Sequence, residues 1–77
     1  MVLEQGVSYR ASLALSGFAR LVGNATVAEK FRDVGFVDVT VTGSGAARQA
    51  TGTWPLATRE VELPEQVTSV DRVGPSA

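Results

Sequence analysis

The feature of this sequence that most constrains its fold is a change of hydrophobic period between residues 7 and 42. Over residues 7–15 the apolar side chains occupy every second position, which predicts a strand with one buried face. Over residues 26–34 the apolar spacing becomes three or four residues, which predicts an amphipathic helix. Valines then alternate with polar residues from Val37 to Thr42, and their β-branched side chains favour a second strand. This order predicts a helix that connects two strands of one sheet.

The segment between the two strands carries its own start and stop signals. Residues 16–22 have the spacing of one or two helical turns and are interrupted by Gly23. Thr26 and Glu29 then have the spacing of a capping box, in which each side chain bonds a free N–H of the first turn. Gly35 suits the left-handed position after a helix, with an apolar residue following it. The prediction is a broken helix whose main part covers residues 26–34.

The second half of the chain reads as further short strands. Residues 43–45 are Gly-Ser-Gly, which predicts a hairpin turn into a weak third strand over residues 46–54. A fourth strand is expected over residues 58–63, and Pro64 marks its end. Residues 66–73 fit either a short strand or a helical turn, and residues 74–77 are expected to form a flexible tail.

These elements predict the α+β class, as a two-layer sandwich in a single small domain over residues 1–73. Its order is strand, broken helix, strand, strand, strand, with helices on one face of a mixed sheet of three to five strands. We expect the helical crossover to leave its two strands parallel and the hairpins to add antiparallel neighbours. The other sheet face is then left to solvent or to a partner. Residues 27–41 are similar to the helix-to-strand corner of ferredoxin-like modules, peptidoglycan-binding repeats and BON-type domains, a likeness that concerns packing alone.

Composition excludes several classes of chemistry. The chain has no histidine and no cysteine, which rules out imidazole or thiolate metal sites and the commonest acid–base catalysts. We therefore expect no metal and no cofactor. The formal net charge of −1 does not offer the clustered positive charge that a nucleic-acid partner requires. No signal peptide or membrane span is visible, so the default expectation is a cytoplasmic location or a place within a particle.

Two short motifs resemble functional sites but have simpler explanations. Residues 43–48 begin like a phosphate-binding loop, yet Arg48 stands where the last glycine is required, so a hairpin turn is favoured. Glu60 and Glu62 share one face of the fourth predicted strand, about 7 Å apart. That separation suits a glycosidase pair, but a solvated strand face accounts for them better.

The sequence thus favours a non-enzymatic interaction module, a small subunit of a larger bacterial or phage assembly. We expect it to bind a protein partner or copies of itself through an open sheet face or a strand edge. The predicted contact residues are Tyr9, Arg10, Trp54 and Arg59. Trp54 fits two roles at this stage, the roof of a small core or a partner contact. The alternative function is a small ligand- or glycan-binding domain that stacks its ligand on Trp54 and Tyr9.

Overall fold

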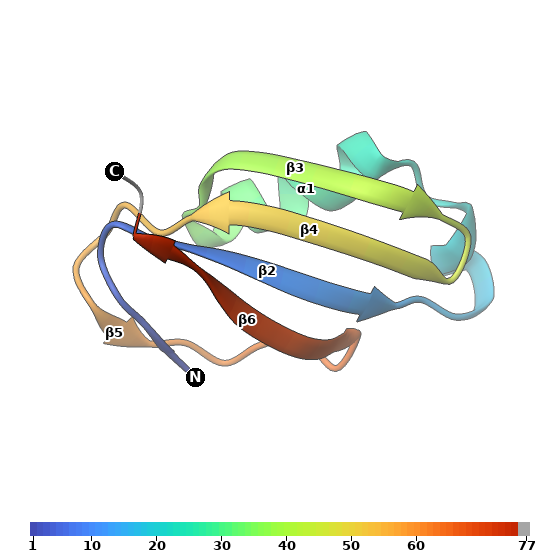
Figure 1. Ribbon diagram of the computed structural model, residues 1–77. Helices are drawn as coiled ribbons and strands as arrows, with labels where there is room; N and C mark the ends of the chain where they lie inside the picture. The colour runs from blue at the N-terminus through green and yellow to red at the C-terminus, as the bar shows by residue number, and fades with distance from the viewer. Residues whose placement is uncertain (76–77) are drawn as a thin grey trace.

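A computed structural model describes residues 1–75 as a small α+β fold with one α-helix, a four-stranded sheet and a two-stranded sheet (Figure 1). Residues 76–77 of the expected tail lie outside the described residues, and the last strand reaches Pro75. In chain order, the elements are β1 (Val2–Leu3), β2 (Val7–Ala14), the 3-10 helix η1 (Gly17–Leu21), α1 (Asn24–Val34), β3 (Val37–Ser44), β4 (Ala47–Thr53), β5 (Arg59–Glu60) and β6 (Val67–Pro75).

The main sheet has the strand order β3-β4-β2-β6, and every neighbouring pair is antiparallel. The expected mixed sheet is therefore wrong. β2 and β3 do run in the same direction, since each is antiparallel to β4, but β4 lies between them. The β3–β4 hairpin folds its second strand inward against β2, which separates the two strands that the helix connects. Residues 67–73 of the ambiguous segment 66–73 belong to the strand β6, which pairs with the other side of β2.

The alternation predicted for β2 is confirmed. Its inward residues Val7, Tyr9, Ala11 and Leu13 are buried. β3 follows its predicted pattern only in part, because Val37 is exposed whereas the next two valines of the strand are half-buried. The cause is a register irregularity after Val37, where the backbone of the following aspartate takes a φ of 53°.

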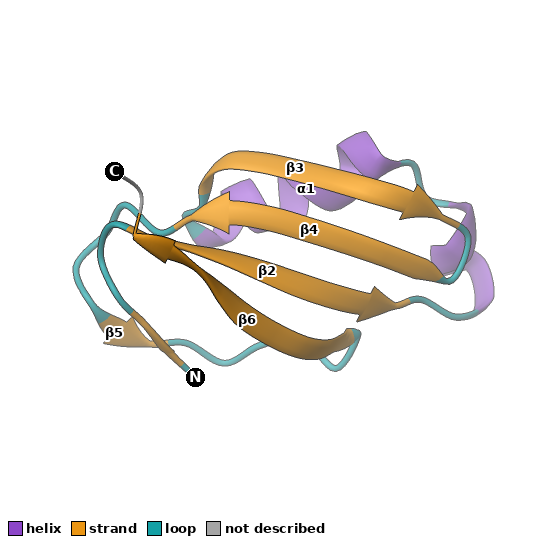
Figure 2. Cartoon of the chain, in the orientation of Figure 1, coloured by secondary structure: helices purple, strands orange, loops and turns teal. Residues whose placement is uncertain are grey.

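Two separate covers lie on the inward face of the sheet. α1 packs its Val27 against Leu13 of β2 and Ala50 of β4, and it lies behind the sheet in Figure 2. Towards the other end of β2, Leu3 and Val61 join the larger cluster around Trp54. The second cover was not predicted, because a two-residue strand such as β1 has too little sequence to show a period.

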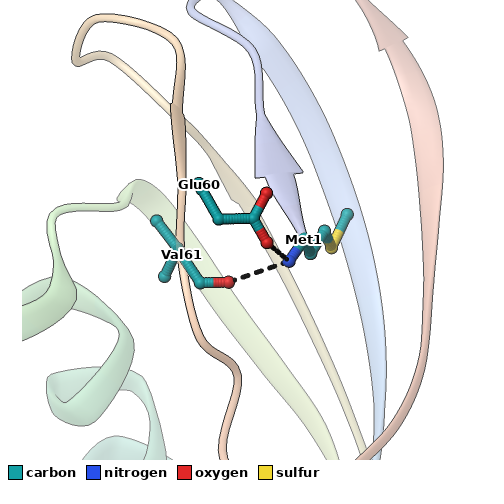
Figure 3. A network of polar contacts seen from close by, with 3 residues as sticks. All are labelled: Met1, Glu60 and Val61. Atoms are coloured by element: carbon teal, nitrogen blue, oxygen red, sulfur yellow. Dashed lines mark hydrogen bonds and ion pairs between the residues drawn. The ribbon is translucent and has the colours of Figure 1, made fainter.

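The second cover is built on the pairing of β1 with β5, which brings Leu3 and Val61 to the cluster around Trp54. The fourth predicted strand, residues 58–63, contracts to Arg59–Glu60, which pairs with β1. The Met1 ammonium group donates to Glu60 Oε1 at 2.5 Å and to the Val61 carbonyl oxygen at 3.0 Å (Figure 3). The Val61 N–H donates in return to the Met1 carbonyl oxygen at 2.8 Å. These bonds hold Val61 where its side chain enters the core.

The two ends of α1 differ in how well they were predicted. The helix begins at Asn24 and its N-cap is Gly23, with no side-chain capping bond, so the capping box at Thr26 is wrong. Its C-terminal end is confirmed. Gly35 has a φ of 130°, and the N–H of Phe36 donates to the Phe31 carbonyl oxygen at 3.2 Å, as the predicted C-terminal motif requires.

Gly35 yields a first testable prediction. We expect Gly35→Ala to lower the free energy of unfolding by about 1–3 kcal/mol, because an L-residue is strained at this φ. A Cβ atom here also lies 2.9 Å from Leu56 Cδ1 and 3.2 Å from Trp54 Cζ3. Urea titration followed by circular dichroism measures the change.

The matched control is Gly23→Ala. Gly23 has a φ of −71°, and a Cβ atom there meets nothing within 4 Å. We expect this control to change stability by less than about 1 kcal/mol. Equal losses in the two variants would contradict the assignment of strain to Gly35.

Candidate functional site

An open apolar groove lies between α1 and the segment that follows β5. Its volume is about 380 Å³. One wall comes from η1 and α1, the other from residues 62–67, and the floor from the C-terminal end of β2. The groove exists because α1 and the segment after β5 each cover only part of the same sheet face. Its apolar lining is Leu13, Leu15, Ala19, Val22, Val27, Phe31, Val34, Phe36, Leu63, Pro64 and Val67.

The groove has few polar groups. Lys30 of α1 and Glu62 of the opposite wall both line it and are both exposed. Thr26 and Gln66 supply the remaining polar side chains. Such a lining, apolar with a few polar groups at the margin, is typical of sites that bind an apolar side chain or a small apolar ligand.

η1 presents two large apolar side chains to solvent beside this groove. Phe18 is 90% exposed and Leu21 is 81% exposed, the highest values among the exposed large apolar side chains. Ala19 of η1 and Val22, which directly follows η1, line the groove. We call Phe18 and Leu21 the η1 pair. Helical turns predicted for residues 16–22 are found at Gly17–Leu21, but none of the residues of η1 is buried.

A buried arginine holds η1 and α1 in place. Arg48 is 6% exposed, and its guanidinium donates to three oxygens from three different segments. The acceptors are the Gly45 carbonyl oxygen at 3.1 Å, Asn24 Oδ1 at 2.9 Å and the Arg20 carbonyl oxygen at 2.9 Å. Asn24 Nδ2 donates in turn to the Gly43 carbonyl oxygen at 3.0 Å. This network, which we call the Arg48 clasp, ties the β3–β4 turn to the start of α1 and to the end of η1.

The structure separates the four predicted contact residues into two kinds. Tyr9 and Trp54 are buried in one core cluster. The Tyr9 hydroxyl accepts a bond from the Glu4 N–H at 2.8 Å, and Trp54 Nε1 donates to the Ala57 carbonyl oxygen at 3.2 Å. Neither ring is open to a partner or to a stacked sugar in this structure.

Arg10 and Arg59 are the exposed members of the predicted set. Arg10 lies on β2 opposite Thr51 of β4 and Asp71 of β6. The Arg59 guanidinium carbon lies 5.7 Å from the centroid of the Trp54 ring. The structure therefore does not bring the four residues together into one surface.

The uncovered face of the sheet is polar. Its side chains are mostly hydroxyls and amides, and Ser8 Oγ lies 2.8 Å from Thr53 Oγ1 across the β2–β4 ladder. A face of this kind has little apolar area to bury against a partner. It is formed by Ser8, Arg10, Ser12, Thr40, Thr42, Gln49, Thr51 and Thr53, with neighbours from β6.

The two motifs that resembled functional sites have structural roles. Residues 43–45 form the β3–β4 turn, as predicted, with φ values of 95° at Gly43 and 64° at Gly45. Glu60 pairs with the Met1 ammonium group, whereas Glu62 lines the groove. Among residues 1–75, no three acidic side chains gather as a metal site would require.

The groove and the Arg48 clasp were both missed by sequence reasoning. A groove between two covers depends on where β1 and residues 62–67 pack, which no local pattern records. The clasp left a weak signal, since Arg48 lies on the same inward face of β4 as Ala50 and Gly52. An arginine at such a position requires several buried oxygen partners.

The comparisons with known proteins add no family. No helix in the described part of the chain is long and apolar enough to cross a membrane. No family model, curated protein or solved structure matches this chain.

Proposed function

We propose that this chain is a non-enzymatic interaction module that binds a protein through the apolar groove and the adjoining η1 pair. The observation that carries the proposal is the exposure of Phe18 and Leu21 on η1, the same short helix whose Ala19 lines an open apolar groove. Burying a side chain of this size contributes about 1.5–3 kcal/mol, so the η1 pair in solvent leaves a considerable driving force unused. A partner that covers η1 and fills the groove recovers it.

The polar face supports this choice of surface. The sequence predicted binding through an open sheet face or a strand edge. Interaction through the uncovered sheet face would have to rely on hydroxyl and amide groups that water already satisfies. The net gain of such hydrogen bonds is small, whereas apolar burial at the groove is favourable throughout. We also propose that the chain is a small subunit of a larger bacterial or phage assembly, and that the groove is its contact site in that assembly.

The test is selection from a random peptide library displayed at low protein concentration. We expect the selected peptides to carry an aromatic or leucine anchor and to bind the native chain with micromolar affinity. Thr26→Trp places an indole at the groove wall, and we expect it to weaken the same peptides at least tenfold.

Thr40→Trp is the matched control, because it places the same indole on the polar face and leaves the groove open. The proposal fails if no anchored peptide is selected, or if Thr26→Trp binds the peptides as well as Thr40→Trp does. Circular dichroism spectra of both variants establish that they are folded.

One observation favours a second candidate, a small apolar ligand. A volume of about 380 Å³ lies within the usual range of ligand pockets, and Lys30 provides a cation at the margin. The ligand-binding alternative then uses the groove in place of Trp54 and Tyr9. Titration with decanoate, followed by the amide signals of groove residues, distinguishes it. Saturable shifts that Thr26→Trp abolishes, without any selected peptide, would favour this candidate.

A further inference from the structure

We infer that the occupant of the groove is the η1 pair of a second copy of this chain, so that two copies exchange their η1 segments reciprocally. This inference rests on the proposed function and names its partner. The same molecule carries both complementary parts, an exposed apolar pair and an open apolar groove, and η1 belongs to both, because it carries the pair and its Ala19 lines the groove. A two-fold arrangement lets each copy supply one of each, and it closes at two copies.

The sizes of the two parts agree. An apolar cavity of about 150 Å³ accommodates a benzene molecule. The groove, at about 380 Å³, therefore has room for the ring of Phe18 and the smaller side chain of Leu21 together. The two residues are spaced three apart on η1, so they project from neighbouring positions of one short helical segment.

The area available predicts a weak dimer. An aromatic side chain buries about 150–250 Å² on insertion, so two exchanged Phe18 rings supply about 300–500 Å² and two leucines add a comparable but smaller amount. A standard stable interface buries about 1,600 Å² in total. The two exchanges together therefore supply about half of that area from the η1 pairs, so we expect dissociation constants from about ten micromolar to one millimolar.

The charges at the groove also permit the exchange. Arg20 lies between the two residues of the η1 pair and is exposed, and Glu62 lines the groove. Seating η1 in a partner's groove brings a guanidinium to the wall that holds this carboxylate, whereas the Lys30 ammonium group belongs to the opposite wall, on α1. The two-fold arrangement repeats the same opposite-charge approach on the other side.

The sheet edges offer a competing mode of self-association. β3 and β6 are the outer strands of the main sheet. An edge-to-edge dimer through either strand would leave Phe18 and Leu21 in solvent. Substitutions in the η1 pair therefore separate the two modes.

The first experiment measures association of the full chain by sedimentation from 10 µM to 1 mM. We expect the native chain to dimerise over this range and Phe18→Ser/Leu21→Ser to sediment as a monomer, with at least a tenfold weaker association. Val73→Ser is the matched control, since Val73 is an exposed valine on β6 outside the groove. It is expected to dimerise like the native chain. Phe18→Ser/Leu21→Ser is expected to fold like the native chain, because both side chains are exposed.

The second experiment tests reciprocity by mixing two variants. Phe18→Ser/Leu21→Ser keeps the groove but lacks the inserting side chains, and Thr26→Trp keeps the η1 pair but fills the groove. Each alone is expected to be monomeric, whereas the mixture regains one of the two exchanges. With the first variant labelled with nitrogen-15, adding the second should shift amide signals around Leu13 and Val27. With the labels reversed, the shifts should move to η1.

The outcomes separate this inference from the proposed function. A native chain that stays monomeric to 1 mM overturns the inference, and so does a dimer that Phe18→Ser/Leu21→Ser does not weaken. Peptide selection against the groove is unaffected by either result, so the interaction function survives if anchored peptides still bind there. Failure of both experiments overturns both proposals.

Discussion

Trp54→Ala is expected to leave the chain largely unfolded at 25 °C. The Trp54 side chain is 0% exposed, and its ring meets that of Phe36 edge to face at a centroid distance of 5.1 Å. Truncating a buried tryptophan to alanine costs about 3–5 kcal/mol, because it loses apolar burial and leaves a cavity. A domain of this length has a total stability of about 4–12 kcal/mol, so a loss of this size removes most or all of a stability at the lower end of that range.

The measurement must avoid tryptophan fluorescence, since Trp54 is the only tryptophan. Far-UV circular dichroism during thermal and urea unfolding serves for the native chain and the variant alike. Arg59→Ala is the control, because it removes the cation above the ring but leaves the ring in place. We expect it to cost less than about 1 kcal/mol. A cooperative transition for Trp54→Ala within a few degrees of the native chain would refute the core role.

The parts of the fold that were predicted are those in which a local pattern and the tertiary environment agree. The inward residues of β2 alternate in the sequence and are buried in the structure, because β2 is a central strand with one covered face. The C-terminal end of α1 was predicted for a similar reason. Gly35 tolerates the required positive φ whatever lies around it.

The parts that were missed depend on contacts between distant segments. Nothing in the sequence of β4 shows that it lies between β2 and β3, since the β3–β4 hairpin could pair with β2 through either of its two strands. The two-residue strand β1 finds its place only through its pairing with β5, far along the chain. The candidate site shares this limit, because its opposite walls come from α1 and residues 62–67.

The predicted contact residues illustrate the same limit at single positions. A tryptophan or tyrosine at a strand end is compatible with a core or a surface role, and the choice rests on what else covers the sheet. Here β1 and Val61 cover Tyr9 and Trp54, whereas nothing comparable covers Phe18. The period of residues 16–22 indicated helix correctly but carried no information about exposure.

Arg48→Met is expected to lower the free energy of unfolding by about 2–4 kcal/mol. The variant keeps an apolar stem of similar length but leaves the oxygens of Gly45, Asn24 and Arg20 without their donor. A hydrogen bond to a charged group contributes about 1.5–3 kcal/mol, and water can reach some of the three oxygens once the clasp opens. The estimate is therefore below the sum of three bonds. Urea unfolding measures it, with Arg10→Met on the exposed polar face as the control, expected to change stability by less than about 0.5 kcal/mol.

A double-mutant cycle between Arg48→Met and Asn24→Ala tests whether the clasp acts as a unit. The two side chains share the bond from Arg48 Nη1 to Asn24 Oδ1, at 2.9 Å. We expect their losses to fall short of additivity by about 1 kcal/mol, as for residues of one hydrogen-bond network. Strict additivity would show that the two residues stabilise the fold independently, and would contradict the clasp.

The clasp also predicts an effect on association, because the Arg20 carbonyl oxygen is one of its acceptors and Arg20 lies within η1. Without that bond, η1 is free to leave the orientation in which Phe18 and Leu21 project beside the groove. Any partner must then order η1 again on binding, which weakens the complex. In Arg48→Met we expect faster amide hydrogen exchange in η1 and an association at least several-fold weaker than in Arg10→Met, at temperatures where both variants are fully folded. Unchanged exchange in η1 together with unchanged association would mean that Arg48 stabilises the fold without positioning the η1 pair.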